Sequence, residues 1–296
     1  MQEQSILVIK LGAFGDFCLA LGRFERIRRH HPDAHITLMT TAPFKDMALK
    51  SPYFDDVRTI ARWSTFAFGP WIRYLRSVWR APYDVVYDLQ SNDRTRILRT
   101  LSPPSMRRGW LDIRKATDTD APAELSGLLY AGPPEDFSWL TRDATVSLPA
   151  SAYVLLVPGS APQHPAKRWP ATHYAGLAQR LVAHGLTPVL LGTAAEAQAT
   201  AVIAHACPQA IDLTARTDFA DIAALAQHAV AAVGNDTGPM HLISLCGCPV
   251  VSLFSCASDP AKSAPRGKTV KVLRADDLAD VSVDAVDAAV QDIAKA

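Results

Sequence analysis

Short runs of β-branched and apolar residues alternate with longer segments of helical periodicity along most of this chain. The clearest strand candidates are Ser5–Lys10, His35–Thr41, Tyr83–Gln90, Tyr153–Val157, Thr187–Gly192 and Pro249–Phe254. Strands that alternate with helices predict parallel α/β units, in which helices cover both faces of each sheet. The length of 296 residues corresponds to about two domains. We therefore predict an α/β fold of two doubly wound, Rossmann-like domains that face a cleft.

A proline-rich stretch separates the two halves of the chain. Residues 102–150 have the least regular pattern. Their six prolines are Pro103, Pro104, Pro122, Pro133, Pro134 and Pro149. We place an N-terminal domain at residues 1–150 and a C-terminal domain at residues 151–281. Residues 282–296 are expected to form a C-terminal helix, capped by Ser282, that can pack back on the N-terminal domain.

Composition favours a folded protein of the cytoplasm. Apolar residues make up 49% of the chain and charged residues 20%, which argues against disorder. No apolar run reaches the roughly 18 residues that span a bilayer. The first five residues include Glu3 and no basic residue, unlike a secretory signal. Five cysteines are an odd number, so we expect no disulfide framework and a reducing compartment.

Basic residues are concentrated in one stretch, although the net charge of the whole chain is only +1. Residues 58–115 contain twelve Lys and Arg against four Asp, a local net charge of +8. Such a stretch can concentrate an anionic partner. Six aromatic residues interleave with these arginines between Trp63 and Trp79. Contact with a membrane surface explains this mixture better than nucleic acid does, because no RNA-binding module signature is present.

The first strand runs into a glycine-marked turn that ends at Asp16. Gly12 and Gly15 allow a tight turn and close approach of a ligand, but the spacing is not that of a dinucleotide fingerprint. A carboxylate at this point can act as a general base toward a hydroxyl group. The alternative is that Asp16 only caps the following helix.

A second candidate segment follows the strand Tyr153–Val157. It contains Ser160 and then Lys167 and Arg168, just before Trp169 and a helix. A lysine on a loop after a strand can reach a phosphate group. The alternative is a solvated basic loop whose tryptophan packs on the domain.

The most informative segment lies between Gly234 and His241. Asp236 and Thr237 stand at the predicted start of a helix, and Gly238 lets a ligand approach the backbone. The unpaired N–H groups and the positive end of the helix dipole favour a diphosphate there. The alternatives are an ordinary helix cap and, for His241, a histidine buried in the core.

Three motifs together resemble glycosyltransferase family 9, the heptosyltransferases of lipopolysaccharide core synthesis. They are ILVIKLGAFGD (Ile6–Asp16), PGS with KRWP (Pro158–Pro170) and NDTGPMHL (Asn235–Leu242), in the order of the family. The resemblance implies a GT-B fold, inversion of the anomeric configuration and no need for a metal. It also implies a donor, typically ADP-heptose, on the C-terminal domain. The acceptor, a phosphorylated lipid A carrying Kdo, would bind the N-terminal domain.

Carried over residue by residue, the resemblance makes Asp16 the catalytic base and puts Lys167 at the donor phosphates, as a second catalytic residue. The donor-binding residues would be Gly15, Ser160, Lys167, Glu196, Asp236, Thr237, Gly238 and His241. Glu196 matches an acid that holds the nucleotide ribose, although it can equally be a carboxylate that stabilises a helix start. The basic stretch lies in the acceptor-binding half of the chain, so the acceptor would bind Arg73, Arg76, Arg80 and Arg94.

No metal or other cofactor is expected. Asp118 and Asp120 form a DxD pattern, but it lies in the proline-rich stretch and not after a strand. The cysteines Cys246, Cys248 and Cys256 lack the paired spacing of a zinc site. The expected partners are therefore a nucleotide-sugar donor and an anionic glycolipid, with peripheral contact at the cytoplasmic face of the inner membrane.

Two other functions fit the same fold. One is a catalytically silent nucleotide-sugar-binding protein, and the other is a nucleotide-sugar epimerase of GT-B architecture. The presence of both Asp16 and Lys167 favours the transferase. The segment Phe254–Pro260 replaces a glycine-rich turn that the family often shows, and this leaves the identity of the sugar open.

Overall fold

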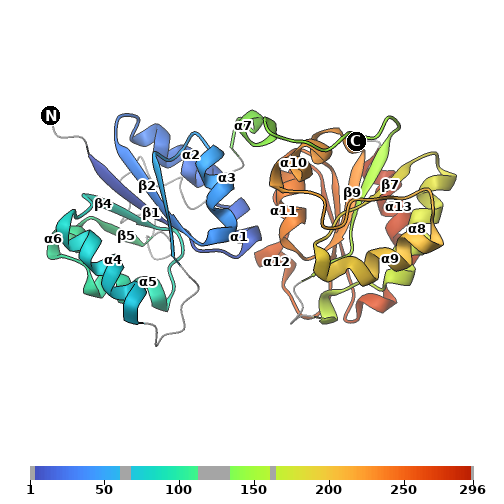
Figure 1. Ribbon diagram of the computed structural model, residues 1–296. Helices are drawn as coiled ribbons and strands as arrows, with labels where there is room; N and C mark the ends of the chain where they lie inside the picture. The colour runs from blue at the N-terminus through green and yellow to red at the C-terminus, as the bar shows by residue number, and fades with distance from the viewer. Residues whose placement is uncertain (1–3, 61–67, 113–133, 161–164, 295–296) are drawn as a thin grey trace. The chain divides into compact units, whose positions relative to one another are not determined.

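The computed structural model describes residues 4–60, 68–112, 134–160 and 165–294 of the chain (Figure 1). The chain divides into two units, Met1–Trp139 and Leu140–Ala296. Each unit contains one sheet of parallel strands with helices packed around it. The predicted fold class of two parallel α/β domains is confirmed. The division falls inside the proline-rich stretch, ahead of the boundary that we placed at residue 150.

The first unit is built on a five-stranded sheet with the order β3-β2-β1-β4-β5. The strands are β1 (Ser5–Ile9), β2 (His35–Thr40), β3 (Asp56–Thr59), β4 (Val85–Asp88) and β5 (Trp110–Asp112). The helices are α1 (Phe14–Cys18), α2 (Leu21–His30), α3 (Lys45–Lys50), α4 (Phe68–Arg80), α5 (Asp93–Leu101) and α6 (Pro104–Arg108), with a 3₁₀ turn at Ala42–Phe44. Figure 1 shows α1, α2 and α3 on one face of the sheet and α4 and α5 on the other.

The second unit is built on a six-stranded sheet with the order β11-β10-β9-β6-β7-β8. The strands are β6 (Tyr153–Val157), β7 (Thr187–Leu190), β8 (Ile211–Asp212), β9 (Ala231–Asn235), β10 (Val250–Phe254) and β11 (Val270–Arg274). The helices are α8 (Ala171–Ala183), α9 (Ala197–Ala206), α10 (Phe219–His228), α11 (Gly238–Leu245), α12 (Pro260–Ser263) and α13 (Val283–Ile293). Three 3₁₀ turns lie at Pro165–Lys167, Ala194–Glu196 and Leu278–Asp280. Every residue of β6, β9 and β10 is buried, as near-continuous apolar runs predict for central parallel strands.

The C-terminal helix α13 packs within the second unit. The Ser282 hydroxyl accepts a hydrogen bond from the Ala285 N–H at 3.2 Å, which confirms the predicted cap. Val286, Val290 and Ile293 are buried in the same core cluster as α8 and β10 residues. The apolar side of α13 is therefore already covered by its own unit. The predicted packing of this helix on the first unit stays a prediction.

The sequence between the first turn and Pro32 predicts a single helix over Phe17–His30, but the structure forms two helices, α1 and α2. The Leu19 N–H donates to the Gly15 carbonyl, and the Ala20 N–H donates to the Phe17 carbonyl three residues earlier. This tightened turn separates α1 from α2. Helix α1 also begins earlier than predicted, at Phe14, so Asp16 lies inside its first turn.

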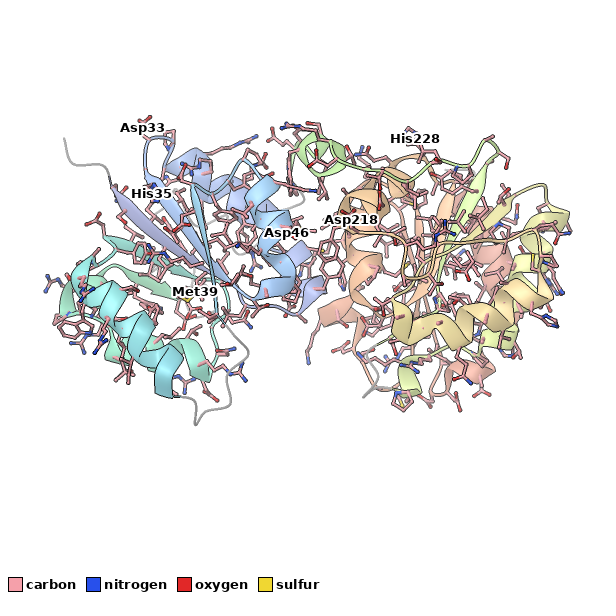
Figure 2. All side chains as sticks on the ribbon, viewed as in Figure 1. Asp33, His35, Met39, Asp46, Asp218 and His228 are labelled. Carbon is pink, nitrogen blue, oxygen red and sulfur yellow. The ribbon has the colours of Figure 1, made fainter. Side chains whose placement is uncertain are left out.

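Helix α10 of the second unit has favourable residues at both of its ends. The Asp218 carboxylate accepts the Asp221 N–H at 2.9 Å and so caps the start of α10. His228 lies in the last turn of the same helix, where a basic group is favourable (Figure 2). Asp221 in turn accepts the N–H groups of Thr145 at 2.7 Å and Val146 at 2.9 Å. The chain is therefore held to the second unit from Thr145 onward.

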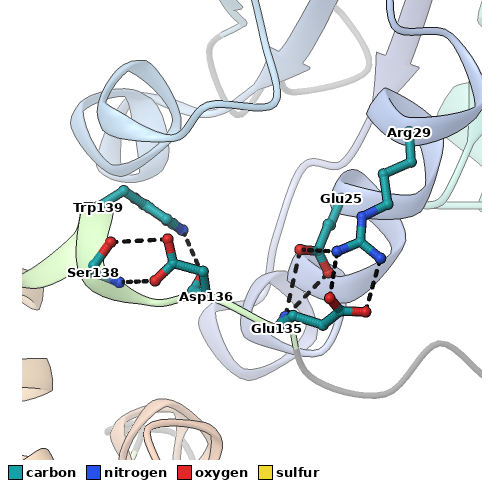
Figure 3. Close-up of polar contacts among 6 residues, drawn as sticks. All are labelled: Glu25, Arg29, Glu135, Asp136, Ser138 and Trp139. Carbon is teal, nitrogen blue, oxygen red and sulfur yellow. Dashed lines mark hydrogen bonds and ion pairs between the residues drawn. The ribbon is translucent and has the colours of Figure 1, made fainter.

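The segment before the division is held to the first unit by polar contacts (Figure 3). Arg29 of α2 binds both carboxylate oxygens of Glu135, at 2.8 and 2.6 Å, and the Glu135 N–H donates to Glu25. Trp139 is buried, and its ring packs edge-on against Tyr53 with centroids 5.7 Å apart. The first unit thus holds this segment as far as Trp139.

In the described parts of the chain, none of the helices has the length and apolar character of a membrane span. All five cysteines lie in the described part of the chain and are unpaired. Three of them, Cys18, Cys207 and Cys248, are buried.

His31 gives the first unit a pH-dependent stability. Burial and the neighbouring His30 and Arg28 lower the pKa of His31 from 6.5 to about 4, and its ring lies 2.7 Å from the Tyr87 hydroxyl. The unfolded chain therefore takes up a proton below pH 6.5 while the folded chain resists it until about pH 4. We expect the free energy of unfolding to fall by about 1 kcal/mol between pH 7 and pH 5, because water reaches part of the ring. The free energy of unfolding of His31→Gln, measured in urea, should lack this part of the pH dependence. A pH dependence equal to that of the parent chain would contradict the prediction.

Candidate active site

The three candidate segments follow β1, β6 and β9, which are central strands of their sheets. Because all strands pair in parallel, each segment lies at the carboxyl edge of its own sheet. Ligands of open α/β sheets bind at this edge. Each unit is considered by itself below.

The turn after β1 presents Asp16 to solvent. Gly12 has a φ of +124°, which only glycine adopts readily, and a Cβ there would lie 3.1 Å from Cε2 of Phe44. Ala13 is the N-cap of α1 and supplies no side-chain capping bond, while Asp16 is exposed in the first turn. Within the described parts of the chain, no hydrogen bond or ion pair occupies the Asp16 carboxylate. Asp16 is therefore not the helix cap, and its carboxylate is available to accept a proton.

Two side chains from neighbouring strand ends hold the backbone of this turn. The Leu11 N–H donates to Oε1 of Gln90 at 3.0 Å, and the Thr41 hydroxyl donates to the Leu11 carbonyl at 3.1 Å. Gln90 follows β4 and Thr41 follows β2, the two strands that flank β1. The sequence analysis did not identify either residue. The available signal was a polar residue just after each of the strands that neighbour β1.

We predict that Gln90→Met lowers the turnover number about tenfold with little loss of stability, because the freed Leu11 N–H lets the Asp16 turn shift. Gln90→Glu keeps the accepting oxygen and should recover most of the turnover. Steady-state kinetics and melting temperatures of both variants check this. Equal turnover of Gln90→Met and the parent chain would show that the Asp16 turn keeps its conformation without the Gln90 hydrogen bond.

In the second unit, Asn235 ties the candidate segments together. Its side chain is fully buried at the end of β9. Nδ2 of Asn235 donates to the carbonyls of Pro158 at 2.8 Å and Gly159 at 3.2 Å. Oδ1 accepts the Trp169 N–H at 3.0 Å and the Tyr174 hydroxyl at 3.1 Å. The segment around Ser160, the segment around Lys167 and the start of the NDTG motif therefore converge on one amide.

Lys167 and Asp236 form an ion pair. Nζ of Lys167 lies 2.7 Å from Oδ2 of Asp236, and the side chains are 19% and 8% exposed. The two predicted donor-binding residues are thus brought together from positions 69 residues apart. A charge-assisted bond in this partly buried position fixes the ammonium group beside the start of α11.

Arg168 is held over Ser160. The guanidinium donates to the Ser160 carbonyl at 3.0 Å and to its hydroxyl at 3.3 Å. Ser160 is buried, whereas Arg168 is exposed. The pair adds a second cation to the same segment as Lys167, so this part of the second unit is suited to an anion.

The start of α11 follows directly after Asp236, the residue that pairs with Lys167. Thr237 occupies the N-cap position, but its side chain makes no capping hydrogen bond. The simple cap alternative is therefore wrong for the Thr237 side chain. Gly238 begins the helix, whose positive end favours an anion. His241 is buried one turn further on, as a core histidine would be, and its role toward a donor stays a prediction.

Glu196 lies close to the Ser160 segment and also caps a helix. A Cβ at Gly159 would lie 2.6 Å from Cγ of Glu196, so glycine is required for this approach. Oε2 of Glu196 accepts the Thr193 N–H at 2.8 Å and the Thr193 hydroxyl at 2.7 Å. The structure thus brings Glu196 beside the candidate site, yet occupies one of its oxygens in a capping box. Both interpretations of this residue stay open.

The predicted acceptor-binding arginines lie on two helices of the first unit. Helix α4 runs from the carboxyl edge of the sheet toward the amino edge, and α5 starts at the carboxyl edge, after β4. Arg94, in the first turn of α5, is therefore nearer to the edge that carries Asp16 than Arg80, the last residue of α4. The side chain of Arg73 lies outside the described residues.

Metal-binding candidates do not come together in the described part of the chain, where no group of three His, Cys, Asp or Glu is placed to hold an ion. Burial raises the pKa of both Cys246 and Cys248 to about 12, so neither thiol is a ready thiolate ligand. The DxD pattern of Asp118 and Asp120 lies outside the described residues.

Comparison with known proteins gives one family. The model of glycosyltransferase family 9 (heptosyltransferase) matches residues 121–289. Lipooligosaccharide heptosyltransferase 2 of Haemophilus influenzae is 23% identical, in an alignment that covers 91% of this chain and 88% of that protein.

Solved structures share the fold over nearly the whole chain. ADP-heptose lipopolysaccharide heptosyltransferase II of Escherichia coli has a TM-score of 0.76 at 22% identity, covering 99% of both chains. A heptosyltransferase of Escherichia coli solved with ADP has a TM-score of 0.74 at 19% identity, covering 97% of this chain and 99% of that one. At these identities the comparison establishes a common fold.

Proposed function

The chain belongs to glycosyltransferase family 9, and from this premise we propose that it is an inverting transferase of heptose or a closely related sugar. The donor is a nucleotide sugar, ADP-heptose, after which one of the structurally similar enzymes is named. The acceptor is the core region of a lipopolysaccharide, a lipid A that carries Kdo. The second unit binds the donor, and the first unit binds the acceptor.

One observation carries this proposal: three segments of the second unit meet around Asn235 at the start of α11. They contribute the ammonium group of Lys167, the guanidinium group of Arg168 and the positive end of a helix. A nucleotide diphosphate needs such a set of cationic and N–H donors, most of all as it leaves with increased negative charge. Glu196, beside Gly159, supports a role at the ribose of the same nucleotide.

The first unit supplies the other half of the chemistry. The exposed Asp16 carboxylate accepts the proton of the acceptor hydroxyl as its oxygen forms a bond to the anomeric carbon. The bond from that carbon to the diphosphate oxygen breaks, and its electrons leave with the nucleotide. Attack on the side opposite the leaving group inverts the configuration. Lys167 and the N–H groups of α11 compensate the charge that the diphosphate gains.

The acceptor carries phosphates and carboxylates, which the arginines of α4 and α5 attract. Arg94, in the first turn of α5, supports contact with phosphates of the acceptor and of the surrounding lipid near the edge that holds Asp16. Arg76 and Arg80, further along α4, support contact with the anionic surface in which the acceptor is embedded. In this proposal the protein works at the cytoplasmic face of the inner membrane through peripheral contact.

A thermal-shift screen of ADP-, GDP- and UDP-sugars tests the donor assignment. A ligand that binds only the folded chain raises its melting temperature. We expect ADP-heptose to give the largest shift, with ADP retaining part of it. A larger shift with a GDP- or UDP-sugar would contradict the assignment of ADP-heptose.

Transfer is expected to survive removal of divalent metal. Lys167, Arg168 and the start of α11 supply the charge compensation that a metal supplies in transferases with a DxD motif. Turnover measured in EDTA should equal turnover in buffer alone. Loss of activity in EDTA that Mg²⁺ or Mn²⁺ restores would refute the metal-free mechanism.

A further inference from the structure

Apolar side chains are exposed together on two neighbouring helices of the first unit. Eight large apolar side chains are exposed among the described residues, and four of them lie on α4 and α5. These are Ile72 and Trp79 of α4 and Ile97 and Leu101 of α5, between 40% and 58% exposed. We call these four residues, with the arginines beside them, the α4–α5 face.

Helical spacing and one hydrogen bond place these side chains on the same side of two neighbouring helices. Ile72 and Trp79 are seven residues apart, as are Arg94 and Leu101, so each pair shares one side of its helix. Nε1 of Trp79 donates to the Leu101 carbonyl at 3.1 Å, which joins the ends of the two helices. Figure 1 shows α4 and α5 next to each other on the same side of the sheet. The buried side chains Tyr74 and Val78 point the other way, into the core of the unit.

The charges on this surface have one sign. Arg76, Arg80 and Arg94 are exposed, and across the described residues no carboxylate pairs with any of them. The one acid at the start of α5, Asp93, is already paired with Arg96 at 3.2 Å. Exposed arginines around a tryptophan and aliphatic side chains match a surface that is anionic outside and apolar just beneath.

We propose that the α4–α5 face docks on an anionic lipid bilayer, with Trp79, Ile97 and Leu101 entering the headgroup region and Arg76, Arg80 and Arg94 binding lipid phosphates. The proposal rests on the proposed function, because a transferase acting on a glycolipid must reach a membrane-bound acceptor. It adds the surface that makes the contact and the side chains that enter the lipid. Indole rings lie favourably at this depth of a bilayer, where the ring is covered and the N–H stays bonded.

Vesicle sedimentation of the full chain tests the proposal. Vesicles of phosphatidylcholine with phosphatidylglycerol should bind the chain, whereas vesicles of phosphatidylcholine alone should bind it at least tenfold more weakly, and added salt should reduce the difference. Changing Trp79 and Leu101 together to Ser, or the three arginines together to Gln, should each weaken binding about tenfold or more. The matched control is Val202→Ser with Ile211→Ser, two exposed apolar side chains of the second unit, which should change nothing.

Fluorescence reports the depth of insertion. Lipids with brominated acyl chains should quench the fluorescence of the chain on binding, and Trp79→Phe should remove most of that quenching. Equal binding to both kinds of vesicle, or quenching that persists in Trp79→Phe, would overturn the proposal. A change in self-association of the chain when the α4–α5 face is altered would also overturn the proposal, because the face would then be an interface with a second copy of the chain.

An acceptor that lacks acyl chains allows transferase activity to be tested separately from docking on the bilayer. Transfer to that water-soluble acceptor, and binding of ADP, should be the same in the parent chain and in the Trp79 and Leu101 variant. Transfer without binding to anionic vesicles would overturn the docking surface and leave the transferase intact. Vesicle binding through this face without transfer would overturn the transferase and leave the docking surface intact.

Discussion

Asp16→Asn is expected to lower the turnover number by about 10²–10⁴-fold while the fold and donor binding stay intact, which is the loss typical of a removed general base. The structure strengthens this expectation, because Ala13 and not Asp16 occupies the N-cap of α1. Asparagine retains the shape of the side chain and loses only the ability to accept the proton. Steady-state kinetics on a verified acceptor measure the effect, and melting curves with ADP titration check fold and donor binding.

Asp46→Asn is the matched control for this experiment. Asp46 is also an exposed aspartate in the first turn of a helix of the same unit, α3 (Figure 2). Loss of a carboxylate near a helix start costs only about 0.3–1 kcal/mol of stability, so Asp46→Asn should leave turnover unchanged. If Asp16→Asn keeps most of its turnover, the base lies elsewhere and the proposed mechanism is wrong.

Lys167→Ala is expected to weaken ADP binding about 10- to 100-fold, because a hydrogen bond to a charged group contributes about 1.5–3 kcal/mol. The structure adds a second consequence. Removal of Lys167 leaves the nearly buried Asp236 carboxylate without its cation, which destabilises the second unit and repels the diphosphate. Titration calorimetry measures the affinity, and urea unfolding measures the stability.

A double variant separates the two consequences. Lys167→Ala with Asp236→Asn removes the unpaired carboxylate, so stability should recover while ADP binding stays weak. Lys271→Ala is the control, since Lys271 pairs with Asp292 at 2.6 Å on an exposed surface of the same unit and should affect neither quantity. Recovery of ADP affinity in the double variant would mean that Lys167 only neutralises Asp236 and does not bind the donor.

The sequence predicts the second unit more accurately than the first, and the reason is burial. The runs at Tyr153–Val157 and Pro249–Phe254 are uniformly apolar because they form central strands, and such runs are distinctive. The edge strands Asp56–Thr59 and Trp110–Asp112 of the first unit are short and mixed in character, so no pattern marked them. The split between α1 and α2 was missed because apolar periodicity continues across the tightened turn.

The candidate site shows a similar limit. Asp16, Lys167 and Asp236 stand out because each lies in a short motif after a strand. Asn235, the amide that gathers those segments, and Gln90, which holds the Asp16 turn, act through partners 61 to 79 residues away along the chain. Their places after strands are visible in the sequence, but local sequence does not show which distant groups they bind. Only the pairing of the strands shows that these side chains meet.

The most direct test of the account is to incubate the purified chain with ADP-heptose and a lipid A–Kdo acceptor and to follow the acceptor by mass spectrometry. The account predicts that the acceptor gains one heptose as ADP is released, and that NMR of the product shows the inverted anomeric configuration. A heptose linked with retained configuration would contradict the mechanism. An unmodified acceptor beside an altered nucleotide sugar would identify an epimerase, and an unmodified acceptor beside an intact, bound donor would identify a silent binding protein.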